Sequence, residues 1–419
     1  MPSDTPGSTA VDSRADEAQQ RYASAMMRTF APPLAVLERG EGCRVWDVDG
    51  REYLDFLGGI AVNSLGHAHP VFVEAVSRQS AAIAHVSNYF ATAPQIALAE
   101  KLRELTGAGE QGRVYFANSG TEANEAAFKL ARLNVEGGAR PRILALRNAF
   151  HGRTMGALAL TGKAAMRAPF EPMPAGVEHI DASVEALESA LDTSVAALVV
   201  EPIQGEAGVI PLPDGFLERA RELTREHGVL LIVDEIQTGV GRTGHWFAYQ
   251  RSGIVPDAIT LAKGLGGGFP VGALVTFGRA SELFQKGHHG STFGGNPLAT
   301  AVAGAVLGEI ERAGLLANAR ERGEQIVRAV DALSSPLISG VRGAGLLLGI
   351  ALTEPVAAEL AAAALAEGLI VNAANEASIR LAPPLIVSAA DVDDFAVRFA
   401  RALSTLTSDH SSTESDPLP

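Results

Sequence analysis

The chain has 419 residues, a formal net charge of −14 at pH 7 and a single cysteine, Cys43. An acidic chain without a dense Lys/Arg stripe argues against nucleic acid or an anionic membrane as its main partner. One cysteine excludes an intramolecular disulfide and fits a reducing compartment. The sequence shows no apolar run of about 20 residues and no charged-then-apolar leader. We therefore expect a globular, cytoplasmic protein without a membrane segment.

Both ends of the sequence are small and polar, which predicts mobile tails at residues 1–24 and 408–419. Between the tails we predict a large domain over residues 81–305. Residues 25–80 and residues 306–407 are predicted to combine into one smaller α/β domain. No linker or internal repeat is visible between the tails.

In chain order, short apolar runs alternate with longer amphipathic stretches. The predicted strands cover residues 114–117, 142–146, 197–200 and 230–233, and the predicted helices cover residues 121–133 and 216–227. Beyond residue 305 helices dominate, with short strands expected around residues 345–352 and 378–381. This pattern predicts an α/β fold with a mostly parallel sheet covered on both faces. Ligands of such sheets gather at the carboxyl ends of the strands.

The first polar motif, Ser119-Gly120-Thr121, follows the first strand of this predicted sheet and opens a helix. The free N–H groups and the positive end of that helix suit a phosphate group, with two hydroxyls to assist. The same residues also fit a plain helix cap.

A carboxylate, Asp234, ends the apolar run 230–233. Buried there it needs a cationic partner, for which a protonated pyridine nitrogen of a cofactor would serve. The alternative is a capping aspartate after a strand.

A lysine, Lys263, ends the apolar run 259–262 and precedes the glycine-rich segment 264–268. A confined, partly desolvated position favours its neutral amine, which is the nucleophile that condenses with a carbonyl group. A surface lysine beside a flexible loop would give the same pattern.

Together these motifs are more specific than any one of them. The sequence resembles the class III (subgroup II) aminotransferases over about residues 26–405. The similar stretches are residues 58–67, 118–124, 148–154, 201–206, 234–239, 263–270, 290–297 and 380–384. The resemblance implies a fold-type I enzyme that depends on pyridoxal 5′-phosphate (PLP) and forms a homodimer with composite active sites.

The same resemblance implies the cofactor contacts. Lys263 carries PLP as a Schiff base, Asp234 pairs with the ring nitrogen, and Phe150 covers the ring opposite Ile236. The other implied contacts are made by Ser119, Gly120, Thr121, Glu235, Gln237 and Thr292, the last of which reaches the phosphate from the neighbouring subunit.

It also implies how substrates bind. Arg153 anchors the distal carboxylate, and Ser291 touches the substrate. Glu206 and Arg380 form a switch, in which the carboxylate hides the guanidinium from an ω-amine donor and releases it to the α-carboxylate of glutamate.

The implied reaction transfers the ω-amine of an acylated ornithine to 2-oxoglutarate. Ile60 supports an acylated donor, because similar ornithine aminotransferases carry a tyrosine there to hold the free α-amine. N2-Acetyl-L-ornithine is the expected donor, with 4-aminobutyrate and succinylornithine as alternatives in the family. A PLP aminomutase and a silent binding protein are the alternatives from other classes. No metal site is expected, because His67 and His69 have no partners with metal-ligand spacing.

Overall fold

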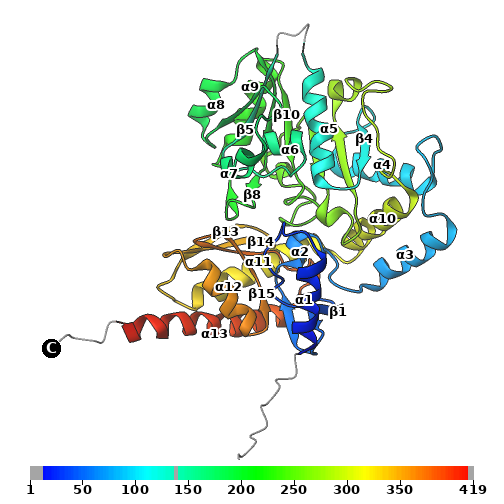
Figure 1. Ribbon diagram of the computed structural model, residues 1–419. Coiled ribbons are helices and arrows are strands. Elements are labelled where there is room, and N and C mark those ends of the chain that lie inside the picture. Colours follow the sequence, from blue (N-terminus) through cyan, green and yellow to red (C-terminus); the bar gives the residue numbers. More distant parts are fainter. Residues whose placement is uncertain (1–12, 136–139, 414–419) are drawn as a thin grey trace, which may run out of the picture.

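The computed structural model describes residues 13–135 and 140–413. Its largest sheet has seven strands in the order β4-β12-β11-β10-β7-β5-β6 (Figure 1). Their bounds are β4 Arg113–Ala117, β5 Arg142–Leu146, β6 Val177–Ile180, β7 Val195–Val200, β10 Leu230–Asp234, β11 Ala258–Leu261 and β12 Gly272–Thr276. The neighbours from β11 to β6 pair in parallel, and β12 runs antiparallel to both β11 and β4. The predicted mostly parallel α/β sheet is confirmed.

Helices cover this sheet because its strands are apolar on both faces, as in β7 and β10, where every residue is buried. The covering elements are α4 Ala93–Thr106, α5 Gly120–Leu133, α6 Met155–Leu160, α7 Ala164–Arg167, η2 Ala168–Phe170, α8 Val184–Ala190, α9 Phe216–Glu226, η3 Ala248–Ser252, η4 Lys263–Leu265 and η5 Gly278–Glu282. Helices α3 Pro70–Ala82 and α10 Pro297–Arg312 pack on each other beside α4. The predicted helices 121–133 and 216–227 therefore correspond to α5 and α9.

Smaller sheets lie below the large one in Figure 1. One has the order β1-β2-β3-β15 and another the order β13-β14-β17-β16, while β8 and β9 form a two-stranded ladder. The bounds are β1 Leu37–Glu41, β2 Arg44–Asp47, β3 Glu52–Asp55, β8 Ile203–Gln204, β9 Ile210–Pro211, β13 Ile338–Ala344, β14 Leu347–Leu352, β15 Leu369–Ile370, β16 Asn372–Asn375 and β17 Ser378–Leu381. The remaining helices are α1 Arg14–Ala25, α2 Gly58–Ala61, α11 Leu315–Ala332, α12 Ala357–Ala366 and α13 Ala389–Thr413.

Strand β15 pairs in parallel with β3, so the beginning and the end of the chain share one sheet. This pairing supports a small domain built from both ends. Helix α10 runs through the predicted boundary between residues 305 and 306. The exact domain limits stay a prediction.

Helices occupy part of both predicted tails, and the mobility of these segments stays a prediction. Residues 14–25 form α1, because Ser13 and Asp16 make a reciprocal capping box that satisfies the first N–H groups of the helix. Arg14 also ties α1 to the Val48 carbonyl at 2.6 Å. At the other end α13 continues to Thr413, since its earlier turns are anchored by buried side chains such as Phe395. Residues 1–12 and 414–419 lie outside the described residues.

Within the described part of the chain, no helix is long and apolar enough to cross a membrane.

Candidate active site

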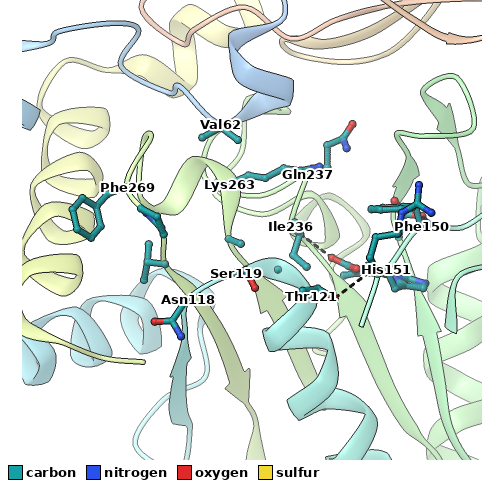
Figure 2. Close-up of a pocket in the computed structure, with 18 of the residues that line it drawn as sticks. Val62, Asn118, Ser119, Thr121, Phe150, His151, Ile236, Gln237, Lys263 and Phe269 are labelled. Atoms are coloured by element: carbon teal, nitrogen blue, oxygen red, sulfur yellow. Dashed lines mark hydrogen bonds and ion pairs between the residues drawn. The ribbon is translucent and has the colours of Figure 1, made fainter. Parts of the chain in front are cut away.

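A cavity of about 430 Å³ opens at the carboxyl ends of β4, β10 and β11. That volume lies in the range of small-molecule sites. Figure 2 shows the labelled side chains of Lys263, Ile236, Ser119, Thr121 and Phe150 arranged around this space. The antiparallel strand β12 lies between β4 and β11, so β4 points the same way as the parallel strands and delivers its end to the same edge.

Lys263 lies directly after β11, at the start of η4. Its φ of 38° is in the left-handed region, which a residue with a side chain seldom adopts, and such strain concentrates at functional sites. Burial lowers the pKa of its amine to about 8, although the carboxylates of Glu206 and Asp234 oppose that shift. The neutral, nucleophilic form of Lys263 is therefore far more populated near neutral pH than that of an ordinary lysine.

Asp234 is held by a buried network at the end of β10. Its Oδ2 accepts hydrogen bonds from Asn124 Nδ2 and from His151 Nδ1, both at 2.7 Å. Its Oδ1 accepts from the Ile236 N–H at 3.0 Å. Burial disfavours a charged His151, but the hydrogen bond and charge of Asp234 outweigh that cost and raise the pKa of the imidazole. Three hydrogen-bond donors therefore fix the orientation of this carboxylate.

A second buried carboxyl group, Glu201, lines the same cavity. Burial raises its pKa to about 7, while nearby His151 and Lys263 lower it. Its Oε2 accepts a hydrogen bond from the Phe150 N–H at 3.0 Å, which positions the backbone of the aromatic residue beside the cavity.

The start of α5 provides the anion-binding end of the cavity. Ser119 caps the helix by accepting from the Glu122 N–H, and the first N–H groups of a helix have no partners inside it. A Cβ on Gly120 would come within 2.9 Å of Ile236, so only glycine allows this close approach. The hydroxyl of Thr121 bonds Thr154 Oγ1 at 2.8 Å, which ties the helix start to the loop that carries Arg153.

The predicted switch pair is present in the structure. Arg380, on β17 and only 2% exposed, donates to Glu206 and forms an ion pair with it. It also donates to Gln237 Oε1 at 3.1 Å and to Asn372 Oδ1 at 2.7 Å. Burial raises the pKa of Glu206, but the charge and hydrogen bond of Arg380 outweigh it and hold that pKa below its ordinary value.

The structure therefore brings most of the predicted residues together. The cavity is lined by Ser119, Gly120, Thr121, Phe150, Arg153, Asp234, Ile236, Gln237 and Lys263, with the Glu206–Arg380 pair joined to it through Gln237. Arg153 is exposed, with its guanidinium 5.8 Å from the Phe150 ring centroid.

Three predicted residues lie elsewhere. Glu235 does not line the cavity, and its carboxylate accepts from Thr238 Oγ1 at 2.6 Å and from the Tyr249 N–H at 2.8 Å, so its cofactor contact stays a prediction. Ser291 and Thr292 also do not line the cavity of their own chain. Their predicted contacts, the one with the neighbouring subunit's phosphate included, stay a prediction.

The sequence analysis gave no role to His151, Glu201 or Asn124. All three stand inside motifs that carry the resemblance, at residues 118–124, 148–154 and 201–206, so a signal was present in the sequence. The contact of Asn124, in α5, with Asp234 is made only by the fold.

The family model described as "Aminotransferase class-III" matches residues 25–403. The chain belongs to the class-III aminotransferases. Among its relatives, the acetylornithine aminotransferase of Streptomyces coelicolor is 53% identical over 390 residues, which cover 93% of this chain and 94% of the relative. The acetylornithine aminotransferase of Mycobacterium tuberculosis is 52% identical over 378 residues, covering 90% and 94%.

Solved aminotransferase structures resemble this chain over most of its length. The N-acetylornithine aminotransferase of Stenotrophomonas maltophilia has a TM-score of 0.80 and 37% identity, covering 90% of this chain and 98% of the other. An ornithine aminotransferase of Toxoplasma gondii, described with PLP at its active site, has a TM-score of 0.89 and 32% identity, covering 96% and 97%.

This class-III aminotransferase is a PLP-dependent enzyme, and its cavity fits the cofactor. The donor set matches the chemistry of each part of PLP: Lys263 for the aldehyde, the carboxyl group of Asp234 for the ring nitrogen, and the start of α5 for the phosphate. Among the described residues, no cluster of three or more His, Cys, Asp or Glu side chains could hold a metal ion.

Proposed function

We propose that this enzyme transfers the ω-amine of N2-acetyl-L-ornithine to 2-oxoglutarate, giving N-acetylglutamate 5-semialdehyde and glutamate, a step of arginine biosynthesis. The relatives that are 49–53% identical over most of the chain all carry the name acetylornithine aminotransferase. The alternative donors for the same site are 4-aminobutyrate and succinylornithine, which also carry an ω-amine.

Bound PLP supplies an electron sink for the pair of electrons left when a proton leaves the substrate carbon. The neutral amine of Lys263, once displaced by substrate, is the base that removes this proton and the acid that returns it. Asp234 would pair with the ring nitrogen, and Asn124, His151 and the Ile236 N–H orient its carboxyl group for that contact. Phe150 and Ile236 enclose the site from two sides.

The buried Glu206–Arg380 pair is the single observation that carries the proposal. An ω-amine donor has no carboxylate beside its reacting carbon, whereas glutamate has one, so a single site must both hide and expose a guanidinium. Arg380 is almost completely buried, and its partner Glu206 keeps 25% of its side-chain surface exposed. The carboxylate can therefore move aside, while Arg153 at the rim suits the distal carboxylate of either substrate.

The donor itself is suggested by Ile60. Its aliphatic side chain, 38% exposed and two residues before cavity-lining Val62, offers no group to bind the free α-amine of ornithine. An acylated amine is uncharged, so it needs no charged or polar partner at this position and binds without a loss of affinity there.

The proposal includes a homodimer. Asn88 donates to the carbonyls of Ser291 and Gly294 at 3.1 and 3.0 Å, which places residues 87–90 beside residues 291–294. This surface exposes large apolar side chains, among them Tyr89 at 92% and Phe293 at 60%. Exposed apolar surface of this kind marks protein contacts, and a second copy covering it would receive Thr292 near its own phosphate seat. A cytoplasmic location is part of the same proposal.

The test is to assay the purified holoenzyme with N-acetylornithine, succinylornithine, ornithine or 4-aminobutyrate, each with 2-oxoglutarate, and to measure glutamate. We expect N-acetylornithine to give the highest kcat/KM. Preference for any of the other three donors would overturn the substrate assignment and leave the cofactor site intact. Turnover that needs no 2-oxoglutarate would identify an aminomutase instead.

A further inference from the structure

The loop that carries Glu206, residues 205–209 between β8 and β9, is held by side chains that donate hydrogen bonds to its backbone carbonyls. The carbonyl of Glu206 accepts a hydrogen bond from Lys163 Nζ at 2.6 Å. The next carbonyl, of Ala207, accepts from Asn375 Nδ2 at 2.7 Å. Both donors are side chains of distant elements, one before α7 and the other at the end of β16.

The following two carbonyls are held by one arginine. Arg342, on β13, donates through Nε to the carbonyls of Gly208 at 2.9 Å and Val209 at 3.2 Å. Its NH2 group donates to Ser378 Oγ at 2.6 Å, which fixes the guanidinium against β17. Every carbonyl from residue 206 to residue 209 therefore has a side-chain donor, and we call Lys163, Arg342 and Asn375 the carbonyl clamp.

The glycine at position 208 is required by this clamp. Its φ is +108°, and a Cβ there would lie 2.5 Å from Asn375 Nδ2, 2.8 Å from Ser378 Oγ and 2.9 Å from Arg342 NH2. A methyl group would therefore both strain the backbone and push the clamp donors away from the carbonyls.

The side chain of Glu206 is held much less firmly than its backbone. Its carboxylate is partly exposed and pairs with Arg380, whereas Gly208 and Val209 in the same loop are buried. Side-chain rotation therefore needs no movement of the loop. A fixed backbone returns the carboxylate to the same position over Arg380 after each turnover.

We propose that the carbonyl clamp is a specificity device: it positions Glu206 so that Arg380 stays masked while the ω-amine donor reacts. This inference deepens the proposed function and rests on it for the identity of the donor. A loosened loop masks Arg380 less well, so the donor's ammonium group meets an uncovered guanidinium. The reaction with 2-oxoglutarate, which needs Arg380 uncovered, does not suffer in this way.

The experiment follows the two half-reactions separately in the holoenzyme, by the change in cofactor absorbance on adding the donor alone and then 2-oxoglutarate alone. For Arg342→Gln we expect kcat/KM for N-acetylornithine to fall about tenfold, as for a lost hydrogen bond to a charged group, with less than about a twofold loss for 2-oxoglutarate. Gly208→Ala should also lower the ratio of kcat/KM for N-acetylornithine to kcat/KM for 2-oxoglutarate. Asn375→Ala, at an exposed position, serves if the other variants fail to fold.

Arg279→Gln is the matched control, because Arg279 donates to the Gly228 carbonyl and to Asn134 far from the loop. In Arg279→Gln the ratio of kcat/KM for N-acetylornithine to kcat/KM for 2-oxoglutarate should equal that of the wild type. An equal fall of both half-reactions in Arg342→Gln and Asn375→Ala, or no change in either, would overturn the clamp. If the wild type prefers 4-aminobutyrate, the proposed donor is wrong, and the same ratio measured with 4-aminobutyrate still decides whether the clamp sets specificity.

Discussion

The two sides of the cavity hold their polar groups in different ways. On the cofactor side, Asp234 is 3% exposed, is held by three donors and lies at the end of a fully buried strand. On the substrate side, which we call the selecting side and which comprises Arg153 and the Glu206–Arg380 pair, Arg153 is exposed and Glu206 is partly exposed in a loop. The carboxyl group that serves every substrate is thus fixed in the core, whereas Glu206, which must cover or release Arg380, stands where its side chain can rotate.

The most damaging change on the cofactor side should be Lys263→Ala. Removing the acid–base group should lower turnover by about 10³-fold or more for every donor alike. Measuring glutamate formation with two donors checks both the size and the uniformity of the loss. Lys101→Ala, which removes an ion-paired lysine on α4, is the control. A loss restricted to one donor would contradict the division between the two sides.

Asp234→Asn should cost about 10²-fold in kcat, again for every donor, because it removes a preorganised charge from the ring nitrogen. It should also lower the pKa of His151, since the hydrogen bond to Asp234 is what raises it. Steady-state kinetics test the first effect and imidazole titration by NMR tests the second. Turnover close to that of the wild type would remove Asp234 from the chemistry.

The incorporation of PLP into the apoenzyme should depend on pH through Lys263. Its pKa is lowered to about 8, so the nucleophilic neutral amine is a minor form below that pH and dominant above it. The rate constant should rise with pH and reach a plateau above pH 8, being about tenfold lower at pH 7. A rate that keeps rising about tenfold per pH unit beyond pH 9, without a plateau, would show that the amine keeps the ordinary pKa of a lysine and is not desolvated.

On the selecting side, Ile60→Tyr should shift preference without damaging the chemistry. A phenol at this position offers a partner to the free α-amine of ornithine, so the ratio of kcat/KM for ornithine to that for N-acetylornithine should rise about tenfold. Ile60→Leu is the control and should leave the ratio unchanged. If Ile60→Tyr lowers both rates equally, position 60 is structural.

The smallest effect of a substitution is expected in α1, which belongs to neither side of the cavity. Ser13→Ala removes the cap and should destabilise this helix by about 1 kcal/mol. Because α1 has no buried residue, amide hydrogen exchange should speed up within residues 14–25 while the global melting temperature stays the same. A lower melting temperature would show that α1 supports the rest of the fold.

The sequence indicated the position of a residue best where that residue ends a strand. Lys263 and Asp234 were expected at one edge because apolar runs lead directly to them, and the fold brings these run ends to that edge. Their roles toward the cofactor stay predictions. Asn124 was missed because its role depends on the packing of α5 over β10, which no local pattern encodes. Glu235 follows Asp234 directly, but its carboxylate is bonded to Thr238 and Tyr249 instead of lining the cavity, which the sequence did not indicate. The α1 cap had a local signal, Ser13 followed three residues later by Asp16, that composition alone concealed.

The pairing of β15 with β3 has a consequence for biosynthesis. Leu54 lies opposite Leu369, so β3 leaves the ribosome long before its parallel neighbour is translated. Throughout that time the nascent chain presents an unsatisfied strand edge, which is a template for intermolecular association. A stop codon anywhere before residue 369 would therefore release a product with this edge permanently open, and its fate would be aggregation or proteolysis rather than partial activity.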